Sequence, residues 1–122
     1  MTTHGADEAL AAFEGTYRAH VEAVERGDLE AVLADMAPGV VPGVFEGVRT
    51  PRGAVAAEVR RIGLAERTGA VHGVGEAVYT PVDGSAPIAL RSWWTRGIDG
   101  VWRADGLENF EPEAEVETGA TE

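Results

Sequence analysis

The sequence contains no cysteine, which excludes disulfide bonds, thiolate catalysis and zinc–thiolate sites. It also contains no lysine, because all ten basic residues are arginines. Schiff-base chemistry and P-loop phosphate binding both require a lysine amine, so they are excluded as well. No apolar run has the length needed to cross a bilayer. The N-terminal residues also lack the basic and hydrophobic regions of a secretory signal, so we expect a cytoplasmic protein.

Acidic residues dominate the charge. The chain carries 21 acidic and 10 basic residues, for a net charge of −11. Residues 111–122 hold five of these acids and read as a disordered acidic tail; without them the net charge is about −6. This balance repels phosphate backbones, so neither nucleic acid nor membrane is expected as a partner. Residues 1–6 are expected to be loose, which leaves one domain at residues 7–110.

Two consecutive helices are predicted in the N-terminal part. The first is expected to run from a cap at Asp7 to about Arg26 and to end at Gly27. Asp28 then caps a second helix, which Pro38 ends. The apolar residues at helical spacing are Leu10, Phe13, Tyr17, Val21, Val24, Leu29, Val32, Leu33 and Met36.

A third helix is predicted after Thr50, which is a cap residue followed by proline at the first helical position. Gly63 is expected to end it. Its predicted buried face consists of Val55, Val59 and Ile62.

Beyond Gly63 the apolar pattern has a period of two, which is typical of strands. Antiparallel strands are predicted at 69–80, 86–96 and 101–110, joined by turns that contain Asp-Gly. A short edge strand is expected at Val40–Phe45. Helices followed by a meander of strands indicate an α+β domain, with the helices on one face of a curved antiparallel sheet.

Three motifs carry a resemblance to a known family: Gly27-Asp28-Leu29, the helix start at residues 51–55, and residues 99–103. In order and spacing they resemble the nuclear transport factor two superfamily, which includes ketosteroid isomerases and SnoaL-like polyketide cyclases. The resemblance implies three helices packed on a curved antiparallel sheet, forming a cone-shaped barrel with an internal apolar pocket. It also implies a homodimer that forms through the convex face of the sheet.

Four residues are candidates for acid–base chemistry. His20 is expected either in the pocket, where the ketosteroid isomerases place a hydrogen-bonding tyrosine, or at the edge of the domain. Tyr17, one turn earlier, is a second donor or a core residue. Asp105 is predicted on the concave face as a general base, or in a structural pair with Arg103. The first-strand aspartate of the isomerases aligns with Val44, and Glu46 is the candidate that replaces it.

The candidate residues for substrate binding are Trp94, Ser92, Arg96, Leu107, Asn109 and Val44. Trp94 is expected to point inward and to hold a flat apolar ligand. Trp93 is expected on the convex face, where Trp102 is a candidate to join it. His72 and Glu76 are expected on a solvated strand face. The histidines lack the paired spacing of a zinc site, so no metal is expected.

These features predict a small cofactor-free enzyme that isomerises, cyclises or dehydrates a hydrophobic metabolite next to a carbonyl group, with polyketides among the candidate substrates. Two alternatives remain open, because a fold does not determine a function. One is a non-catalytic ligand-binding or dimerisation module. The other is a protein-recognition domain that uses the convex face of the sheet.

Overall fold

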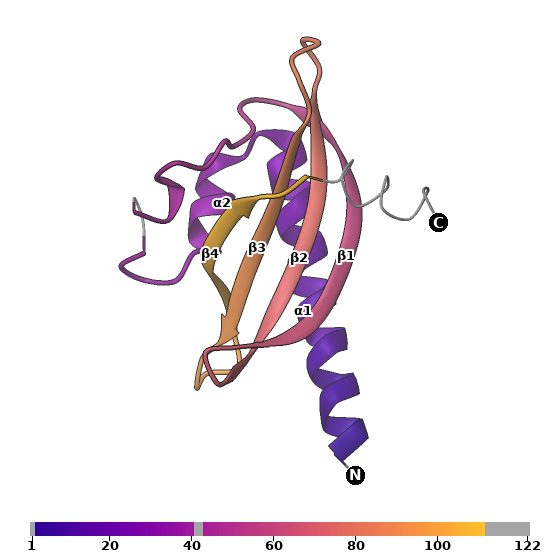
Figure 1. The fold of residues 1–122 in the computed structure, drawn as a ribbon, viewed down its shortest axis with the longest axis vertical. Helices are drawn as coiled ribbons and strands as arrows, with labels where there is room; N and C mark the ends of the chain where they lie inside the picture. Colours follow the sequence, from indigo (N-terminus) through magenta and orange to yellow (C-terminus); the bar gives the residue numbers. More distant parts are fainter. Residues whose placement is uncertain (1, 41–42, 112–122) are drawn as a thin grey trace.

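The computed structural model describes residues 2–40 and 43–111, with side chains from residue 7 onward. Helices α1 (Thr2–Arg26) and α2 (Leu29–Ala34) precede a 3₁₀ turn, η1 (Gly43–Phe45). Strands β1 (Val55–Arg67), β2 (Ala70–Pro81), β3 (Ile88–Arg96) and β4 (Trp102–Asn109) form an antiparallel sheet in chain order. Helix α1 crosses one face of this sheet, and α2 lies at the β4 side (Figure 1). The α+β class is confirmed.

The sheet is open. Its order is β1-β2-β3-β4, and no pairing within the described residues joins β1 to β4. The expected cone-shaped barrel is therefore not formed, and the described residues form two α-helices in place of the expected three. We call the sheet face toward α1 the inner face and the opposite one the outer face.

The reversal between the two helices agrees with the sequence. Gly27 has a φ of 71°, in the left-handed region that favours glycine. The Asp28 carboxylate caps α2 by accepting the backbone N–H of Ala31 at 3.2 Å. Helix α1 begins at Thr2, so the backbone of residues 2–6 is helical and Asp7 is not a cap. The predicted tail lies almost wholly outside the described residues.

The third predicted helix is wrong, because Val55–Arg67 is strand β1. The register with β2 shifts between Val59 and Arg61, which inserts one extra residue in β1. This bulge changes the phase of the alternation. As a result Val55, Val59 and Ile62 all face inward at spacings of four and three, which imitate a helix. Gly63 accordingly lies within the strand. At Val40–Phe45 the structure shows η1 in place of the expected strand, and residues 41–42 are outside the described part.

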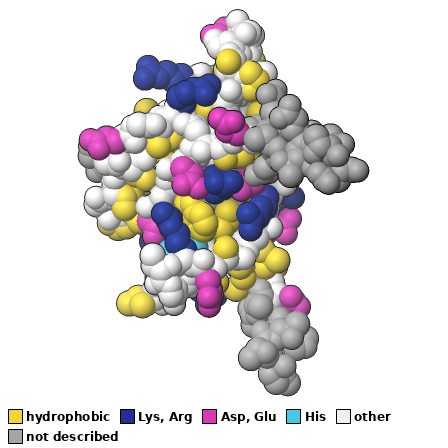
Figure 2. Space-filling model, in the orientation of Figure 1, with side chains coloured by type: hydrophobic (Ala, Val, Ile, Leu, Met, Phe, Trp, Pro, Cys, Tyr) yellow, Lys and Arg dark blue, Asp and Glu magenta, His cyan; other side chains and the backbone are white. Residues whose placement is uncertain are grey.

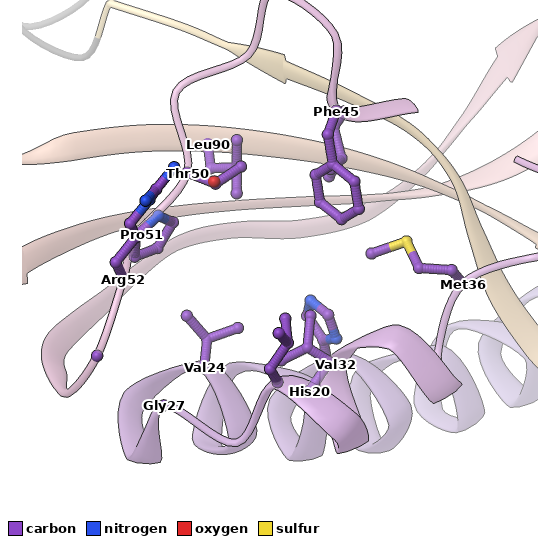
Figure 3. A pocket seen from close by; sticks show the side chains of 13 residues that line it. His20, Val24, Gly27, Val32, Met36, Phe45, Thr50, Pro51, Arg52 and Leu90 are labelled. Atoms are coloured by element: carbon purple, nitrogen blue, oxygen red, sulfur yellow. The ribbon is translucent and has the colours of Figure 1, made fainter. Parts of the chain in front are cut away.

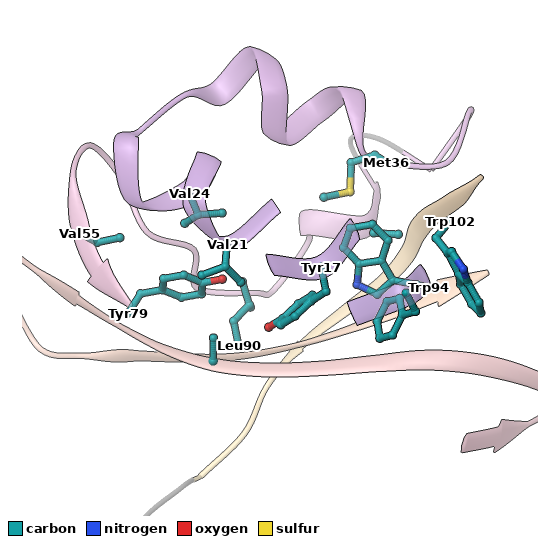
Figure 4. Packing of buried hydrophobic residues seen from close by; sticks show 12 residues of the cluster. Tyr17, Val21, Val24, Met36, Val55, Tyr79, Leu90, Trp94 and Trp102 are labelled. Atoms are coloured by element: carbon teal, nitrogen blue, oxygen red, sulfur yellow. The ribbon is translucent and has the colours of Figure 1, made fainter. Parts of the chain in front are cut away.

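The core forms where α1 meets glycines of β2. The rings of Phe13 and Tyr17, both almost completely buried, lie against Gly73 and Gly75. A Cβ atom on Gly73 would come within 2.7 Å of the Phe13 ring, and one on Gly75 would overlap the Tyr17 ring. Trp94 on β3 packs edge-on against both aromatic rings, at centroid distances of 5.8 Å from Phe13 and 6.1 Å from Tyr17. Figure 4 shows Trp94 beside Tyr17. The absence of side chains at Gly73 and Gly75 thus allows α1 to pack closely on β2.

The outer face carries a network of ion pairs around a buried acid. Glu76 is only 4% exposed, and its carboxylate accepts a hydrogen bond of 2.7 Å from Arg91. Arg91 also donates to Glu108 at 2.7 Å, which lowers the pKa of the Glu108 carboxyl below its ordinary value. His72 contacts Trp93 edge-on on the same face. His72 and Glu76 therefore share a face as expected, but side chains cover them and the face is not solvated there.

Neither helix in the described part of the chain combines the length and the apolar character that crossing a lipid bilayer requires.

Replacing Gly75 by alanine tests the contact between α1 and β2. The added methyl group has to displace the Tyr17 ring, so we expect Gly75→Ala to lower the free energy of unfolding by about 1–3 kcal/mol. Urea denaturation followed by circular dichroism measures the change. Gly63→Ala in β1 is the matched control, because its nearest neighbour is a side-chain atom of Arg61 at 3.8 Å. Equal losses of unfolding free energy in both variants would contradict the proposed role of Gly75 in the contact between α1 and β2.

Candidate functional site

A cavity of about 530 Å³ opens between the two helices, the segment before β1, and strands β3 and β4. This volume falls within the range of small-molecule sites. Most of its wall is apolar, and its polar side chains are those of His20, Thr50 and Arg52 (Figure 3). The other lining residues are Val24, Gly27, Leu29, Val32, Met36, Phe45, Pro51, Gly53, Leu90 and Leu107.

His20 is the buried polar group of this cavity. It is 4% exposed, and its imidazole lies edge-on to the Trp94 ring at a centroid distance of 5.0 Å. Its Nδ1 atom is 2.9 Å from Oδ2 of Asp35, whose side chain is 34% exposed. Asp35 follows the last turn of α2, so the reversal at Gly27 brings its carboxylate back to α1. The two residues form a hydrogen-bonded pair at the cavity wall.

The second ring nitrogen of His20 faces the cavity. Within the described residues, Nε2 of His20 has no hydrogen-bond partner. Nε2 is also not fully enclosed by the protein, because the side-chain polar atom there that is both enclosed and without a partner is Nε1 of Trp102. Figure 3 shows the imidazole rising from α1 into the space below Phe45. An ionised carboxylate only accepts hydrogen bonds, so pairing with Asp35 requires a proton on Nδ1, and in a neutral ring this leaves Nε2 as the proton acceptor.

Asn109 fixes the rim of the cavity. Its side chain accepts from the backbone N–H of Arg49 at 2.8 Å and donates to the carbonyl oxygens of Arg49 and Ala89, each at 3.0 Å. These bonds attach the segment that carries Thr50 and Arg52 to the edge of the sheet. Asn109 was expected to bind substrate, and the structure gives it this supporting position.

Three of the predicted residues lie behind the cavity. Tyr17 is buried between α1 and β2, and burial raises the pKa of its phenol well above the ordinary value. Trp94 points inward as predicted, but it supports His20 instead of lining the cavity. Ser92 accepts a hydrogen bond of 2.7 Å from Nε1 of Trp94 and is buried with it. Of the predicted binding residues, Leu107 lines the cavity.

The predicted position of Asp105 on the concave face is wrong. Trp93 pairs with Gly106 and Trp94 with Ala104, so Asp105 is the extra residue of a bulge in β4. Its carboxylate accepts a hydrogen bond of 2.5 Å from the hydroxyl of Thr95 on the outer face. The alternation that placed Asp105 with Leu107 and Asn109 does not hold across a bulge. The alternative pair with Arg103 is not formed either, because Arg103 binds Asp99 at 3.0 Å.

The remaining predicted residues do not line the cavity. Arg96 is exposed at the end of β3, over the ring of Trp102. Trp102 is buried against Phe13 at a centroid distance of 5.1 Å, so it does not belong to the outer face. Val44 is half-buried within η1, and Glu46 is exposed in the turn that follows. Neither residue lines the cavity.

Asp35 is the residue that sequence reasoning missed. One signal for it exists: a carboxylate at the C-terminal end of a helix is unfavourable to the helix dipole, so a compensating partner is expected there. The pairing with His20, fifteen positions earlier, depends on how α2 folds back on α1. Among the residues whose side chains are described, no group of three or more His, Asp or Glu lies close enough together to hold a metal ion.

Comparison of the chain with protein-family models, curated proteins and solved structures finds no match.

The tautomer of His20 tests the pair directly. We expect the Nδ1–H form, with Nε2 unprotonated, because the Asp35 carboxylate accepts the Nδ1 proton. Long-range ¹H–¹⁵N correlation of labelled protein at neutral pH distinguishes the two tautomers. In Asp35→Ala the constraint is lost, and the Nε2–H form should appear. An Nε2–H form in the unsubstituted protein would show that the pair is not made.

Proposed function

We propose that the protein is a small cofactor-free enzyme that performs acid–base chemistry next to a carbonyl group of an apolar metabolite. The observation that carries this proposal is the pair of His20 and Asp35 at the wall of a mostly apolar cavity. Histidine is the side chain best suited to accept and return a proton near neutral pH. Isomerisation, cyclisation and dehydration are the reaction types that this pair supports.

In the proposed reaction, Nε2 of neutral His20 removes a proton from the carbon next to the substrate carbonyl. The electrons of the broken C–H bond move to the carbonyl oxygen and give an enolate, and the proton stays on the imidazole. Asp35, hydrogen-bonded to Nδ1, stabilises the imidazolium. The same nitrogen then returns the proton to a different carbon, which isomerises the substrate, or to a departing hydroxyl group, which dehydrates it.

The cavity wall supports this chemistry in two ways. Apolar side chains such as Val32, Met36 and Phe45 limit water around the imidazole, which strengthens electrostatic interactions inside the cavity. The edge-on contact with Trp94 limits rotation of the His20 ring. The order and spacing of the Gly27–Leu29, 51–55 and 99–103 motifs, which resemble the nuclear transport factor two superfamily, favour the same assignment, while β1 stands where that resemblance implies a third helix.

Deuterium exchange tests this function without a known substrate. We expect the protein to speed the incorporation of deuterium next to the carbonyl of β-tetralone in D₂O, followed by ¹H NMR. His20→Gln should lower the rate by about 10²–10⁴-fold, which is the usual contribution of a general base. Asp35→Ala should lower it less, since the base remains but loses its orientation.

Asp105→Asn distinguishes this proposal from the expectation drawn from the sequence. It removes one carboxylate from the outer face, so the exchange rate should not change. Circular dichroism and thermal melting confirm that each variant is folded. Exchange that persists in His20→Gln, or that is lost in Asp105→Asn, contradicts the assignment of the base. No exchange by the unsubstituted protein on β-tetralone or other apolar ketones favours the non-catalytic ligand-binding module.

We propose as a second candidate function that the outer face joins two copies of the chain. The favouring observation is its balanced charge within an acidic protein: Arg61, Arg67 and Arg91 lie among Glu76 and Glu108. Figure 2 shows hydrophobic atoms near the centre of this face, with basic and acidic side chains interspersed around them. A two-fold axis can place the acids of one copy against the arginines of the other, so such a face is self-complementary.

Trp93→Ala tests this association. The Arg67 guanidinium lies 4.5 Å from the centroid of the Trp93 ring. Removing the Trp93 ring therefore takes away both apolar contact area and the ring on which Arg67 is stacked. Sedimentation velocity should show a dimer for the unsubstituted protein and a shift toward monomer for Trp93→Ala. We expect the dissociation constant of the dimer to rise about tenfold or more. Ile98→Ala, at an exposed position in the β3–β4 turn, is the control. A monomer at every concentration would contradict the second candidate.

A further inference from the structure

Within the described residues, the arginine at the mouth of the cavity has no partner. Arg52 is exposed, and it lines the cavity from the segment that precedes β1. Among the described residues, no ion pair, hydrogen bond or ring contact involves its guanidinium. An arginine without a protein partner, at the edge of an apolar cavity, is available to a ligand.

The other nine arginines are engaged. Arg49 donates to a backbone carbonyl, and Arg67 and Arg96 lie against tryptophan rings. The other six form ion pairs with acidic side chains: Arg18, Arg26, Arg60, Arg61, Arg91 and Arg103. Within the described part of this acidic chain, Arg52 is therefore the arginine whose guanidinium has no protein partner.

A second donor lies beside it. Thr50 is half-buried in the same segment, and its hydroxyl has no hydrogen-bond partner among the described residues. Figure 3 shows Thr50 and Arg52 on one side of the cavity and His20 across from them on α1. Asn109 holds this segment through the backbone of Arg49, so the two donors start from a fixed position.

We infer that the cavity takes an apolar molecule with one carboxylate group, which Arg52 and Thr50 bind at the mouth while the apolar body extends toward His20. A guanidinium and a hydroxyl satisfy the two oxygens of a carboxylate by charge-assisted hydrogen bonds. A phosphate dianion is disfavoured, because one arginine faces it and the net charge of −11 repels it. This inference rests on the proposed function only because both concern the same cavity; it assigns the ligand that the cavity binds.

A pair of probes tests the carboxylate. Naphthylacetate and naphthylacetamide have nearly the same shape and differ in charge. Isothermal titration calorimetry should show that the unsubstituted protein binds the acid about five- to tenfold more tightly than the amide. Arg52→Gln should remove this preference by weakening the acid and leaving the amide unchanged. Thr50→Val, which keeps the shape of the side chain, should reduce the preference by a smaller factor.

Arg18→Gln is the matched control. It removes the same charge from α1, where Arg18 pairs with Glu14 away from the cavity, so the preference for the acid should persist. The inference is overturned if acid and amide bind equally, if Arg52→Gln weakens both alike, if Arg18→Gln has the same effect, or if neither probe binds. Binding and deuterium exchange are separate measurements. If the preference depends on Arg52 while exchange does not depend on His20, the inference stands and only the catalytic proposal fails.

Discussion

The packing of two aromatic rings of α1 on two glycines of β2 determines the rest of the structure. Phe13 and Tyr17 occupy the space above Gly73 and Gly75, where a Cβ atom would overlap them. This contact sets how closely α1 approaches the sheet, and it sets the rotation of the helix about its axis. Because His20 follows Tyr17 by three residues, the same rotation turns the imidazole toward the sheet, onto Trp94. His20 is therefore positioned by packing that lies outside the cavity.

The partner of His20 is positioned by backbone hydrogen bonds. The N–H of Ala104 donates to the carbonyl of Asp35, and the N–H of Ala37 donates to the carbonyl of Ala104, both at 2.8 Å. They attach the end of α2 to β4, so the Asp35 carboxylate is held from the sheet while His20 is held from α1. Backbone bonds of this kind tolerate many changes of side chain. The geometry of the pair accordingly depends on the fold more than on its immediate neighbours.

The sequence predicted α1, the reversal at Gly27 and Asp28, and the positions of strands β2 to β4 along the chain. It failed at two bulges. In β1 the extra residue near Arg60 gave the inward side chains a helical spacing, and in β4 the extra residue was Asp105 itself. A single inserted residue moves every following side chain to the other face. No glycine or proline stands beside Arg60 in β1, and Gly106, which follows Asp105 in β4, does not by itself distinguish a bulge from a regular strand position. The cavity was anticipated through His20 and Leu107, but Asp35 required knowledge of how α2 packs.

The bulge in β4 also restricts the chemistry that the cavity can support. Because Asp105 is on the outer face, no carboxylate lines the cavity among the described residues, and Asp35 reaches it only through His20. Some reactions need an acid and a base at separate positions; in hydrolysis, for example, one group activates water while another protonates the leaving group. Such reactions require two acid–base side chains in the cavity. One imidazole serves when the proton that is removed is also the proton that is returned. If the proposed enzyme function holds, a single histidine in an apolar cavity therefore favours isomerisation, or elimination within one substrate molecule, over hydrolysis.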